Sequence, residues 1–475
     1  MKRFLCTITA AAIAAVASRA DAAGLYTSDR GVRPLGRGGA YVAGADDLHA
    51  IWYNPAGLAD AGSSVLVDFA WVNFSSEFMR RAQVTDAGGT NRVVTFPQVN
   101  GSSDFLPIPT IAGSYNFGKA KEYTLAFGVH APYTAIASYP ETVNGQPAPS
   151  RYSLVSLRGS ALVVVGAYLA WKPSEKFRIG GGIEALVGKF QSSVVFSASP
   201  SDRLIAAPED PQYDTASQLD VGPIISPSAN AGIIWEPVPA WHLGLSGQLP
   251  NWVNAPAHVN VRLPTAAPFD NAYQDGNTAR VKFVLPAIVR AGIEYRGNLH
   301  KDVDIRVEVA YVREFWSEHQ SIDIESKGIR LYDITGFPSP FGVAPISIPR
   351  HFQDSNSFRL GAELMLKNFG GYWIDLRGGI TYETSAIPDN WVSPLTFDAN
   401  KFIGTGGGSL HIGKNWRMDA VAAFAHMGSI DVAPENAQVP RINPVRGNPT
   451  ATEPINGGSY AARTLLLGVG VNYKF

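Results

Sequence analysis

The stretch Asp302–Tyr311, DVDIRVEVAY, decides the fold class of this chain. Its apolar and charged residues alternate: Val303, Ile305, Val307, Val309 and Tyr311 form one face, and Asp302, Asp304, Arg306 and Glu308 form the other. A period of two is typical of a β-strand whose two faces meet different environments. The same division recurs in 177–187, 281–295, 358–367 and 372–383. The chain is therefore predicted to be all-β.

Two environments explain such strands: a soluble sandwich with an apolar core, or a membrane barrel with an apolar outer face and a polar lumen. We count about fourteen candidate strands, an even number as single-chain bacterial barrels require. They begin near Ser64, Leu106, Tyr123, Leu154, Phe177, Ile224, Trp241, Arg280, Asp302, Ser357, Gly371, Asn400, Asn415 and Ser459.

The connections between these strands alternate between short and long. The short ones are GKAKE (118–122), KPSE (172–175), EPVPA (236–240), GNLHK (297–301), KNFGG (367–371) and GKN (413–415). Short periplasmic turns and long external loops are typical of outer-membrane barrels. Next to the short turns lie Trp171, Trp235, Trp241, Trp373 and Trp416, as expected for an interfacial girdle. We predict a fourteen-stranded antiparallel transmembrane β-barrel.

Composition agrees with that fold. Charged residues make up 17% of the chain, which carries 47 glycines and a formal net charge of -1. The longest apolar run of the expected mature chain, 161–171, is far shorter than the roughly 20 residues of a membrane helix. A charge near zero gives no reason to expect nucleic acid, which normally leaves a basic stripe.

The N-terminus has the pattern of a secretory signal peptide. Lys2 and Arg3 precede an apolar run over 4–17, and Ala20 and Ala22 set up a cleavage site. The expected location after cleavage is the bacterial outer membrane. Cys6, the only cysteine, falls in the removed segment, so the mature protein is expected to contain no disulfide.

A glycine-rich, aperiodic segment separates this signal from the strands. Its many buriable side chains, among them Tyr41, Leu48, Trp52 and Tyr53, favour a folded plug over a solvated tail. Within it, Gly36 and Gly38 permit tight turns, while Asp46 and Asp47 are expected to cap a short helix that Pro55 ends. The predicted organisation is a signal peptide (1–22), an N-terminal hatch (23–62) and the barrel (63–475).

The segments LGRGGA (35–40) and AGADDLHAIWYNPAGLA (43–59) resemble the hatch of the long-chain fatty-acid outer-membrane transporter family, the FadL type. That family also includes TodX-like transporters of aromatic hydrocarbons. The later segment SAIPDNWVSPLTFDANKF (385–402) resembles a family stretch as well, so the resemblance covers essentially the whole chain. Its most specific part is Asn54, Pro55, Ala56 and Gly57.

The resemblance implies a hatch inside a fourteen-stranded barrel and a passive transport mechanism. Long-chain fatty acids or other hydrophobic compounds are captured among the external loops and enter an apolar pocket. Hatch rearrangement then releases them sideways through a kink in the third strand. Leu25 resembles the apolar hatch residue that reaches into the family's pocket.

The third strand, YTLAFGVHAPYTAIASYP (123–140), contains Pro132, which cannot donate a ladder hydrogen bond. We expect a break around His130, Pro132 and Tyr133, helped by Gly128, at the place of the family's lateral opening. A tolerated bulge without a transport role is the alternative.

The family's fatty-acid members hold the carboxylate with basic side chains in an apolar pocket. Near the end of the fifth strand this chain reads QSSVVF (191–196), with Lys189 nearby, and Lys189 and Arg290 are the candidate ligand-binding bases. A polar network that braces the lumen is the favoured interpretation of Arg290, as of Arg178, Arg306, Arg359, Arg377 and Arg417. Fatty acid and neutral hydrocarbon both remain open as substrates.

Other functional classes find little support. The chain has no Gly-x-Ser-x-Gly pentad, its scattered histidines have no metal-ligand spacing, and the glycine run 404–408 opens no helix. We therefore expect no catalytic residue, metal or cofactor. An outer-membrane enzyme, a nonspecific porin and a surface receptor are the alternative functions. The expected partners are hydrophobic small molecules, outer-membrane lipid and lipopolysaccharide, and the expected state is a monomer.

Overall fold

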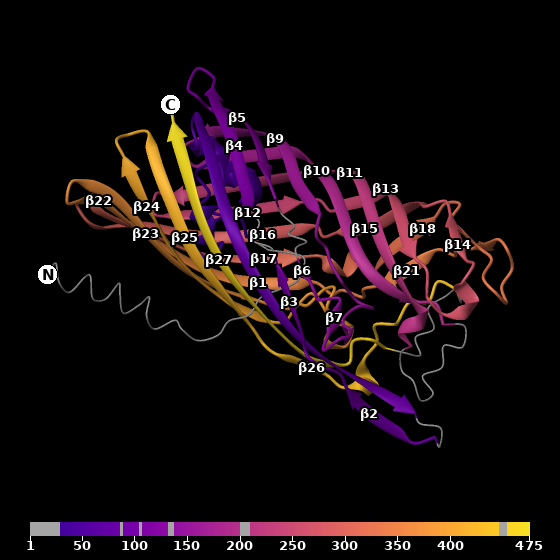
Figure 1. Ribbon diagram of the computed structural model, residues 1–475. Coiled ribbons are helices and arrows are strands. Elements are labelled where there is room, and N and C mark those ends of the chain that lie inside the picture. Colours follow the sequence, from indigo (N-terminus) through magenta and orange to yellow (C-terminus); the bar gives the residue numbers. More distant parts are fainter. Residues whose placement is uncertain (1–28, 86–88, 104–106, 132–136, 200–209, 446–453) are drawn as a thin grey trace.

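The computed structural model of the chain describes residues 29–85, 89–103, 107–131, 137–199, 210–445 and 454–475. Its strands form one antiparallel barrel that closes where the last strand pairs with the first, Ser64↔Lys474 to Arg80↔Gly458 (Figure 1). Closure gives β1 a partner on each side, β27 and β4. The predicted fourteen-stranded antiparallel barrel is confirmed.

The wall consists of fourteen strands, two of which are interrupted. In order they are β1 (Ser64–Thr85), β4 (Pro107–Phe117), β5 (Tyr123–His130), β9 (Ala161–Ser174), β10 (Phe177–Ser197), β11 (Asp214–Val238), β12 with β13 (Trp241–Gln248 and Asn251–Arg262), β15 with β16 (Thr278–Leu285 and Ile288–His300), β17 (Val303–Glu314), β22 (Ser355–Phe369), β23 (Tyr372–Glu383), β24 (Lys401–Ile412), β25 (Trp416–Met427) and β27 (Gly458–Lys474).

Smaller strands extend the long-loop end of the wall or lie within its loops, and short helices lie in the loops and in the segment before β1. The strands are β2 (Asn91–Thr95), β3 (Val99–Ser103), β6 (Ala137–Ser138), β7 (Thr142–Val143), β8 (Gln146–Pro147), β14 (Tyr273–Asp275), β18 (Ser321–Ser326), β19 (Arg330–Tyr332), β20 (Phe341–Gly342), β21 (Ile346–Pro349) and β26 (Ile430–Val432). The helices are α2 (Val32–Leu35), α3 (Ala50–Tyr53), η1 (Pro55–Asp60), η2 (Pro211–Tyr213), η3 (Ala267–Phe269), η4 (Trp316–Glu318), η5 (Asp389–Trp391) and η6 (Pro434–Asn436). No helix in the described part of the chain is long and apolar enough to span a membrane.

Most wall strands begin within two residues of the predicted positions, but two predictions were wrong. β9 begins at Ala161 rather than Leu154, because Leu154 belongs to a loop and is buried in the apolar core. β11 begins at Asp214 rather than Ile224, since a bulge opposite Gly188 lets this strand run past Pro223. The predicted run 281–295 is divided at Pro286, which cannot donate to the ladder.

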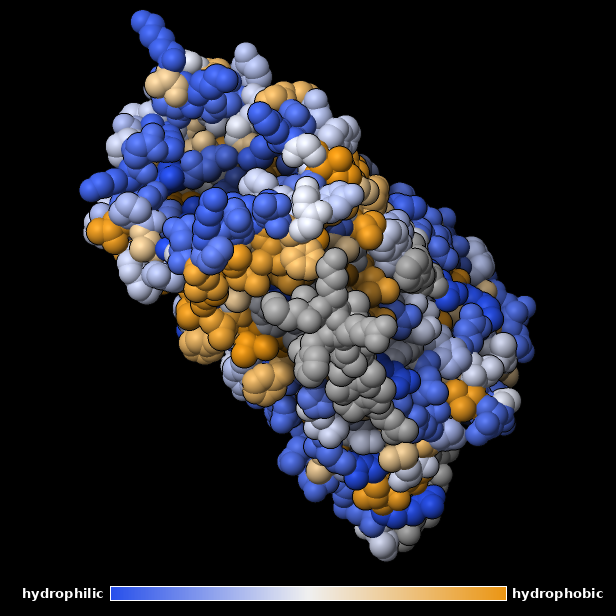
Figure 2. Space-filling model, turned by 90° about the vertical axis from the view of Figure 1, so that its left-hand side faces the viewer, coloured by the Kyte–Doolittle hydropathy of each residue, from blue (hydrophilic) through white to orange (hydrophobic). Residues whose placement is uncertain are grey.

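The outer face of the barrel is apolar, as the alternation predicted. Ile183, Ile225 and Phe402 are among its exposed side chains, and the five tryptophans beside the short turns are exposed as well. Figure 2 shows apolar side chains gathered across the middle of one face, between hydrophilic ends. Such a band matches the hydrocarbon layer of a membrane.

The lumen is divided into two parts, so the prediction of a polar lumen was only half right. Around residues 29–61, at the short-turn end, inward side chains of the wall are charged, among them Glu294, Arg306 and Glu363. Toward the long loops the inward residues are apolar, and loop side chains such as Leu154 and Phe397 pack against them. The sequence shows the alternation of a strand, but not which loops fold back into the lumen.

Candidate functional site

Residues 29–61 lie folded inside the barrel, where helices α2, α3 and η1 are enclosed by the wall (Figure 1). We call this segment the hatch. Tyr41, Leu48, Ile51 and Tyr53 are fully buried. The helix α3 ends before Pro55, as predicted from the missing N–H of proline.

Glycines of the wall make room for the hatch backbone. A Cβ atom at Gly244 would lie 2.5 Å from the carbonyl oxygen of Val42, and one at Gly379 would lie 2.3 Å from the carbonyl carbon of Arg37. Seven other wall glycines also face the hatch: Gly128, Gly180, Gly232, Gly292, Gly361, Gly407 and Gly468. The hatch therefore approaches the wall closely at nine positions that carry no side chain.

Buried ion pairs anchor the hatch to the wall. Arg37 Nη2 lies 2.5 Å from Glu294 Oε2 and 3.3 Å from Glu308 Oε2. Arg306 of the wall reaches the other way, with Nη1 2.7 Å from Asp46 Oδ2 of the hatch. In addition, the backbone N–H groups of residues 42, 43 and 44 donate to the carboxylate of Glu308, at 2.6, 2.9 and 3.0 Å.

Of the two predicted capping residues, Asp47 accepts the backbone N–H of His49, the residue before α3, through Oδ1 at 3.0 Å, whereas Asp46 is bound to arginines instead. Asp46 pairs with Arg33 and Arg306, and Asp47 Oδ2 lies 2.7 Å from Arg417 Nη2. Because buried arginines need carboxylate partners, charge compensation occupies Asp46 and the second oxygen of Asp47.

His49 lies between two carboxylates. Its Nδ1 is 2.9 Å from Asp47 Oδ1, and its Nε2 is 2.5 Å from Asp68 Oδ2 on β1. Burial alone would lower the pKa of His49, but the two carboxylates raise it to about 9. At neutral pH the imidazolium thus links the hatch to the wall.

The residues Asn54, Pro55 and Gly57 tie the hatch together. Asn54 Nδ2 donates to the carbonyls of Val42 and Ile233, at 2.9 and 3.0 Å, and its Oδ1 accepts the N–H of Ala56. A Cβ at Gly57 would lie 2.3 Å from the carbonyl oxygen of Ala45. Among the other predicted hatch glycines, Gly38 has a φ of 61°, and Gly36 packs beside Arg377. Leu25 lies outside the described residues.

The third wall strand, β5, ends at the predicted place. The β5–β9 ladder stops at His130↔Val164, and pairing resumes at Ala137 and Ser138, which pair with β3. Gly128 has a different role from the predicted one: it is regularly paired, and its missing side chain leaves room for Ile51 of the hatch. Pro132 and Tyr133 lie outside the described residues.

Four buried side chains meet where the hatch faces β5 and β16, and we call them the floor cluster: Arg30, Trp52, His130 and Arg290. The guanidinium carbons of Arg30 and Arg290 lie 3.8 and 4.5 Å from the centre of the Trp52 ring system. The His130 ring meets Trp52 edge-on, with 5.4 Å between ring centres. Arg290 lies two residues from Gly292 along β16, and His130 lies two residues from Gly128 along β5, in each case toward the long loops. Because both glycines contact the hatch, the cluster lies at the floor of the apolar lumen.

The other predicted basic residues have different surroundings. Lys189 is exposed and lies in the β10 bulge, between Gly188 and Phe190. Arg178 pairs with Asp60 and Glu236, Arg359 with Asp29, and Arg377 with Glu363 and Asp375. The structure does not bring Lys189 and Arg290 together.

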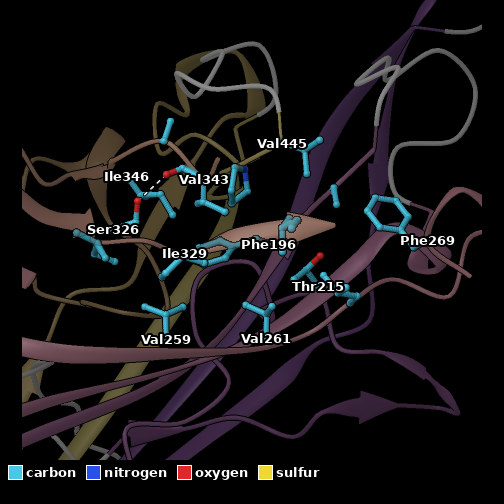
Figure 3. Close-up of a pocket in the computed structure, with 16 residues that line it drawn as sticks. Phe196, Thr215, Val259, Val261, Phe269, Ser326, Ile329, Val343, Ile346 and Val445 are labelled. Carbon is cyan, nitrogen blue, oxygen red and sulfur yellow. Dashed lines mark hydrogen bonds between the residues drawn. The ribbon is translucent and has the colours of Figure 1, made fainter. Parts of the chain in front are cut away.

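An apolar pocket of about 60 Å³ lies near the long-loop end. Figure 3 shows Val259 and Val261 of β13, Phe196 of β10 and Ile346 of β21 around a common space. Among the described residues that line it, Thr215 and Ser326 are the only polar ones and none carries a charge. The Ser326 hydroxyl donates to the carbonyl of Val343 at 2.5 Å.

Arg350 is a buried cation that sequence reasoning missed. It follows β21, its guanidinium donates to Thr396 Oγ1, and it lies 5.0 Å from the Phe352 ring centre. Within the described part of the chain no carboxylate pairs with Arg350, and burial lowers its pKa to about 9, so it remains cationic at neutral pH. The one signal in the sequence was an arginine in an apolar stretch, ISIPRHF (346–352).

The described residues contain no group of three or more side chains arranged to hold a metal ion. The closed barrel, its apolar outer face and the enclosed hatch define a plugged transport barrel of the bacterial outer membrane. The family model described as outer membrane protein transport protein (OMPP1/FadL/TodX) matches residues 13–475. The chain belongs to this family and is an outer-membrane transporter of hydrophobic compounds.

Solved structures share this fold at low sequence identity. A Pseudomonas aeruginosa FadL homologue is 14% identical with a TM-score of 0.70, over 95% of this chain and 100% of its own. The Ralstonia pickettii toluene transporter TbuX is 15% identical with a TM-score of 0.58, over 94% and 98%. The P. putida toluene transporter TodX is 14% identical with a TM-score of 0.57, over 90% and 94%. The search of curated proteins found no match.

Proposed function

We propose that this transporter takes up long-chain fatty acids as carboxylates, and that Arg350 holds the carboxylate during capture. The supporting observation is the isolation of Arg350: a buried guanidinium without a carboxylate partner is destabilising by several kcal/mol. A fatty-acid anion would supply the missing charge and accept charge-assisted hydrogen bonds. The apolar surroundings would favour its acyl chain.

The distance from Arg350 to the pocket suits a long chain. Ile346 lines the pocket, and Ile348 and Arg350 follow it at a spacing of two, so an extended backbone places all three on one face. Four residues span about 13 Å at ~3.3 Å per residue. A bound acyl chain would extend from Arg350 along the isoleucines into the pocket.

A neutral hydrocarbon is the second candidate substrate, because none of the described residues that line the pocket is charged. At about 60 Å³, however, the pocket is smaller than the ~150 Å³ cavity that holds a benzene ring in an engineered protein. An aromatic ring would enter only after side chains move. A slender acyl chain needs less displacement.

For release we propose a lateral route at the end of β5, following a rearrangement of the hatch. The end of the β5–β9 ladder at His130 supports this route. Transport would be passive, by a monomer that lies among outer-membrane lipid and lipopolysaccharide. We also propose that a signal peptide (1–22) is cleaved, leaving the hatch (23–62) and the barrel (63–475).

Arg350→Gln tests the substrate class. The variant is expected to bind oleate about 10- to 100-fold more weakly, because it loses a charge-assisted hydrogen bond to the carboxylate. Binding of 1-octadecene, which has no carboxylate, should stay unchanged. Binding is measured on the purified protein in detergent. The matched control is Arg313→Gln, which removes a partly exposed arginine near the long-loop end of β17. Equal oleate affinity in Arg350→Gln and the intact protein would contradict the carboxylate assignment.

Cellular uptake tests the route. Deleting the gene should abolish uptake of labelled oleate, and deleting residues 23–61 should admit small polar solutes. Pro132→Val tests the lateral exit, because a strand-forming residue would favour a continuous wall. If this variant transports oleate and octadecene like the intact protein, the lateral route is wrong.

A further inference from the structure

We propose that the floor cluster is a second carboxylate station, which receives the fatty-acid headgroup between Arg350 and the end of β5. This inference rests on the proposed function, since it concerns the same substrate. It names a binding site of this chain in which Trp52 and His130 donate hydrogen bonds and Arg30 and Arg290 supply positive charge.

Unsatisfied polar atoms point to a ligand at this site. Nδ1 and Nε2 of His130 and Nε1 of Trp52 are buried and have no hydrogen-bond partner among the described residues. A buried donor without a partner is destabilising, so such groups normally bind protein, water or ligand. Here all three unsatisfied nitrogens belong to two neighbouring rings of one cluster.

The electrostatic surroundings favour an anion. The positive charges of Arg30 and Arg290 act on both His130 and Glu184. Glu184 is the acidic neighbour, and its Oε1 is held by the hydroxyl of Tyr168 at 2.8 Å and the amide of Asn230 at 3.0 Å. Asn230 also donates to the carbonyl of Ile51, at 2.8 Å, and so places Glu184 beside the hatch. Oε2 of Glu184 also has no hydrogen-bond partner, but the two guanidinium groups outnumber this one carboxylate, so the indole and imidazole donors are left for an added acceptor.

The position of the cluster explains why a headgroup would stop there. Arg290 and His130, the two wall residues of the cluster, lie between the apolar lumen on the long-loop side and the hatch on the short-turn side. His130 is also the last residue of β5. A carboxylate leaving Arg350 would otherwise cross apolar surroundings without a counter-charge. All four side chains are buried in this structure, so the station opens only when neighbouring groups move.

The test compares two probes, labelled oleate and labelled 1-octadecene, in uptake by cells that carry each variant. Trp52→Phe keeps an aromatic ring and removes the indole N–H, and His130→Phe removes both ring nitrogens. We expect the double variant to take up oleate about tenfold more slowly, with octadecene uptake within about twofold of the intact protein. Trp52→Phe with His130→Gln keeps an amide donor and should recover part of the oleate uptake.

If Trp52 and His130 had a purely structural role, their substitution would slow the uptake of oleate and octadecene equally. An equal loss of oleate and octadecene uptake, or an oleate-to-octadecene ratio within about twofold of the intact protein, would overturn the station. Arg350→Gln is measured in parallel, because its failure to weaken oleate binding refutes the proposed function whatever the floor variants do. The converse result is weaker oleate binding in Arg350→Gln while the Trp52 and His130 variants leave the oleate-to-octadecene uptake ratio unchanged. That result would refute the second carboxylate site and leave the proposed function standing.

Discussion

Arg37 of the hatch and Glu294 of β16 form an ion pair in which both side chains have no exposed surface, with 2.5 Å between Nη2 and Oε2. The two residues are 257 positions apart in the chain. Charges this deeply buried stay paired, because separating them leaves each one desolvated. This contact and its neighbours hold the plug inside the barrel.

Glu294→Gln should loosen the hatch. Removing one partner of a buried pair costs about 3–5 kcal/mol, so amide hydrogen exchange over 29–61 should become faster in the purified protein. Asp431→Asn is the control, since Asp431 pairs with Arg81 at the surface, where a pair contributes about 1 kcal/mol or less. Unchanged exchange in Glu294→Gln would show that this pair does not anchor the hatch.

Gly379→Ala should displace the hatch by steric conflict. The new Cβ would lie 2.3 Å from the carbonyl carbon of Arg37 and the amide nitrogen of Gly38, both backbone atoms. We expect a rise in the passage of small polar dyes across the outer membrane. The neighbouring Gly378→Ala, whose Cβ would meet nothing closer than 3.9 Å, is the matched control and should leave dye uptake unchanged. Equal dye uptake in both variants contradicts the prediction.

The hatch should be more weakly held at alkaline pH. His49 has a pKa of about 9 in the folded protein, above its ordinary 6.5, so its contribution is complete below about 6.5 and is lost as the pH rises through about 9. Exchange over 29–61, corrected for its intrinsic pH dependence, should therefore accelerate between pH 7 and pH 10. His49→Gln should remove this part of the pH dependence; if it persists in that variant, another group is responsible.

Val261→Phe should fill the apolar pocket. We expect about tenfold weaker binding of both oleate and octadecene, equivalent to about two buried methylene groups at ~0.8 kcal/mol each. Arg350→Gln, in contrast, should affect only oleate. Val289→Phe, on the exposed outer face of β16, is the control. Unchanged affinity for both probes in Val261→Phe would show that this pocket takes no part in capture.

Much of the barrel could be predicted because its signals are local. Strand alternation depends on neighbouring residues, and the short turns follow directly from the strands they join. β10 began at the predicted Phe177. The two wrong starts, at Leu154 and Ile224, arose where an apolar loop resembled a strand and where a bulge accommodated Pro223.

The candidate site was predicted less completely. Local sequence marked Asn54 and Pro55 and assigned Asp46 and Asp47 to a cap, but it did not reveal that both pair with arginines of distant strands. It suggested Lys189, whose side chain is exposed, and it missed Arg350. Burial and charge partners depend on segments far apart in the chain, so no local pattern reveals them.

The sequence by itself determined an all-β barrel with alternating faces, short turns at one end and a glycine-rich segment before the first strand, because each of these is a property of nearby residues. Only the tertiary structure decided that Glu308 accepts three hatch amides, that Trp52 and His130 meet, and that Arg350 has no carboxylate beside it among the described residues. The physical reason is closure of the barrel. It brings distant strands around one lumen and excludes the water that would otherwise solvate their charges.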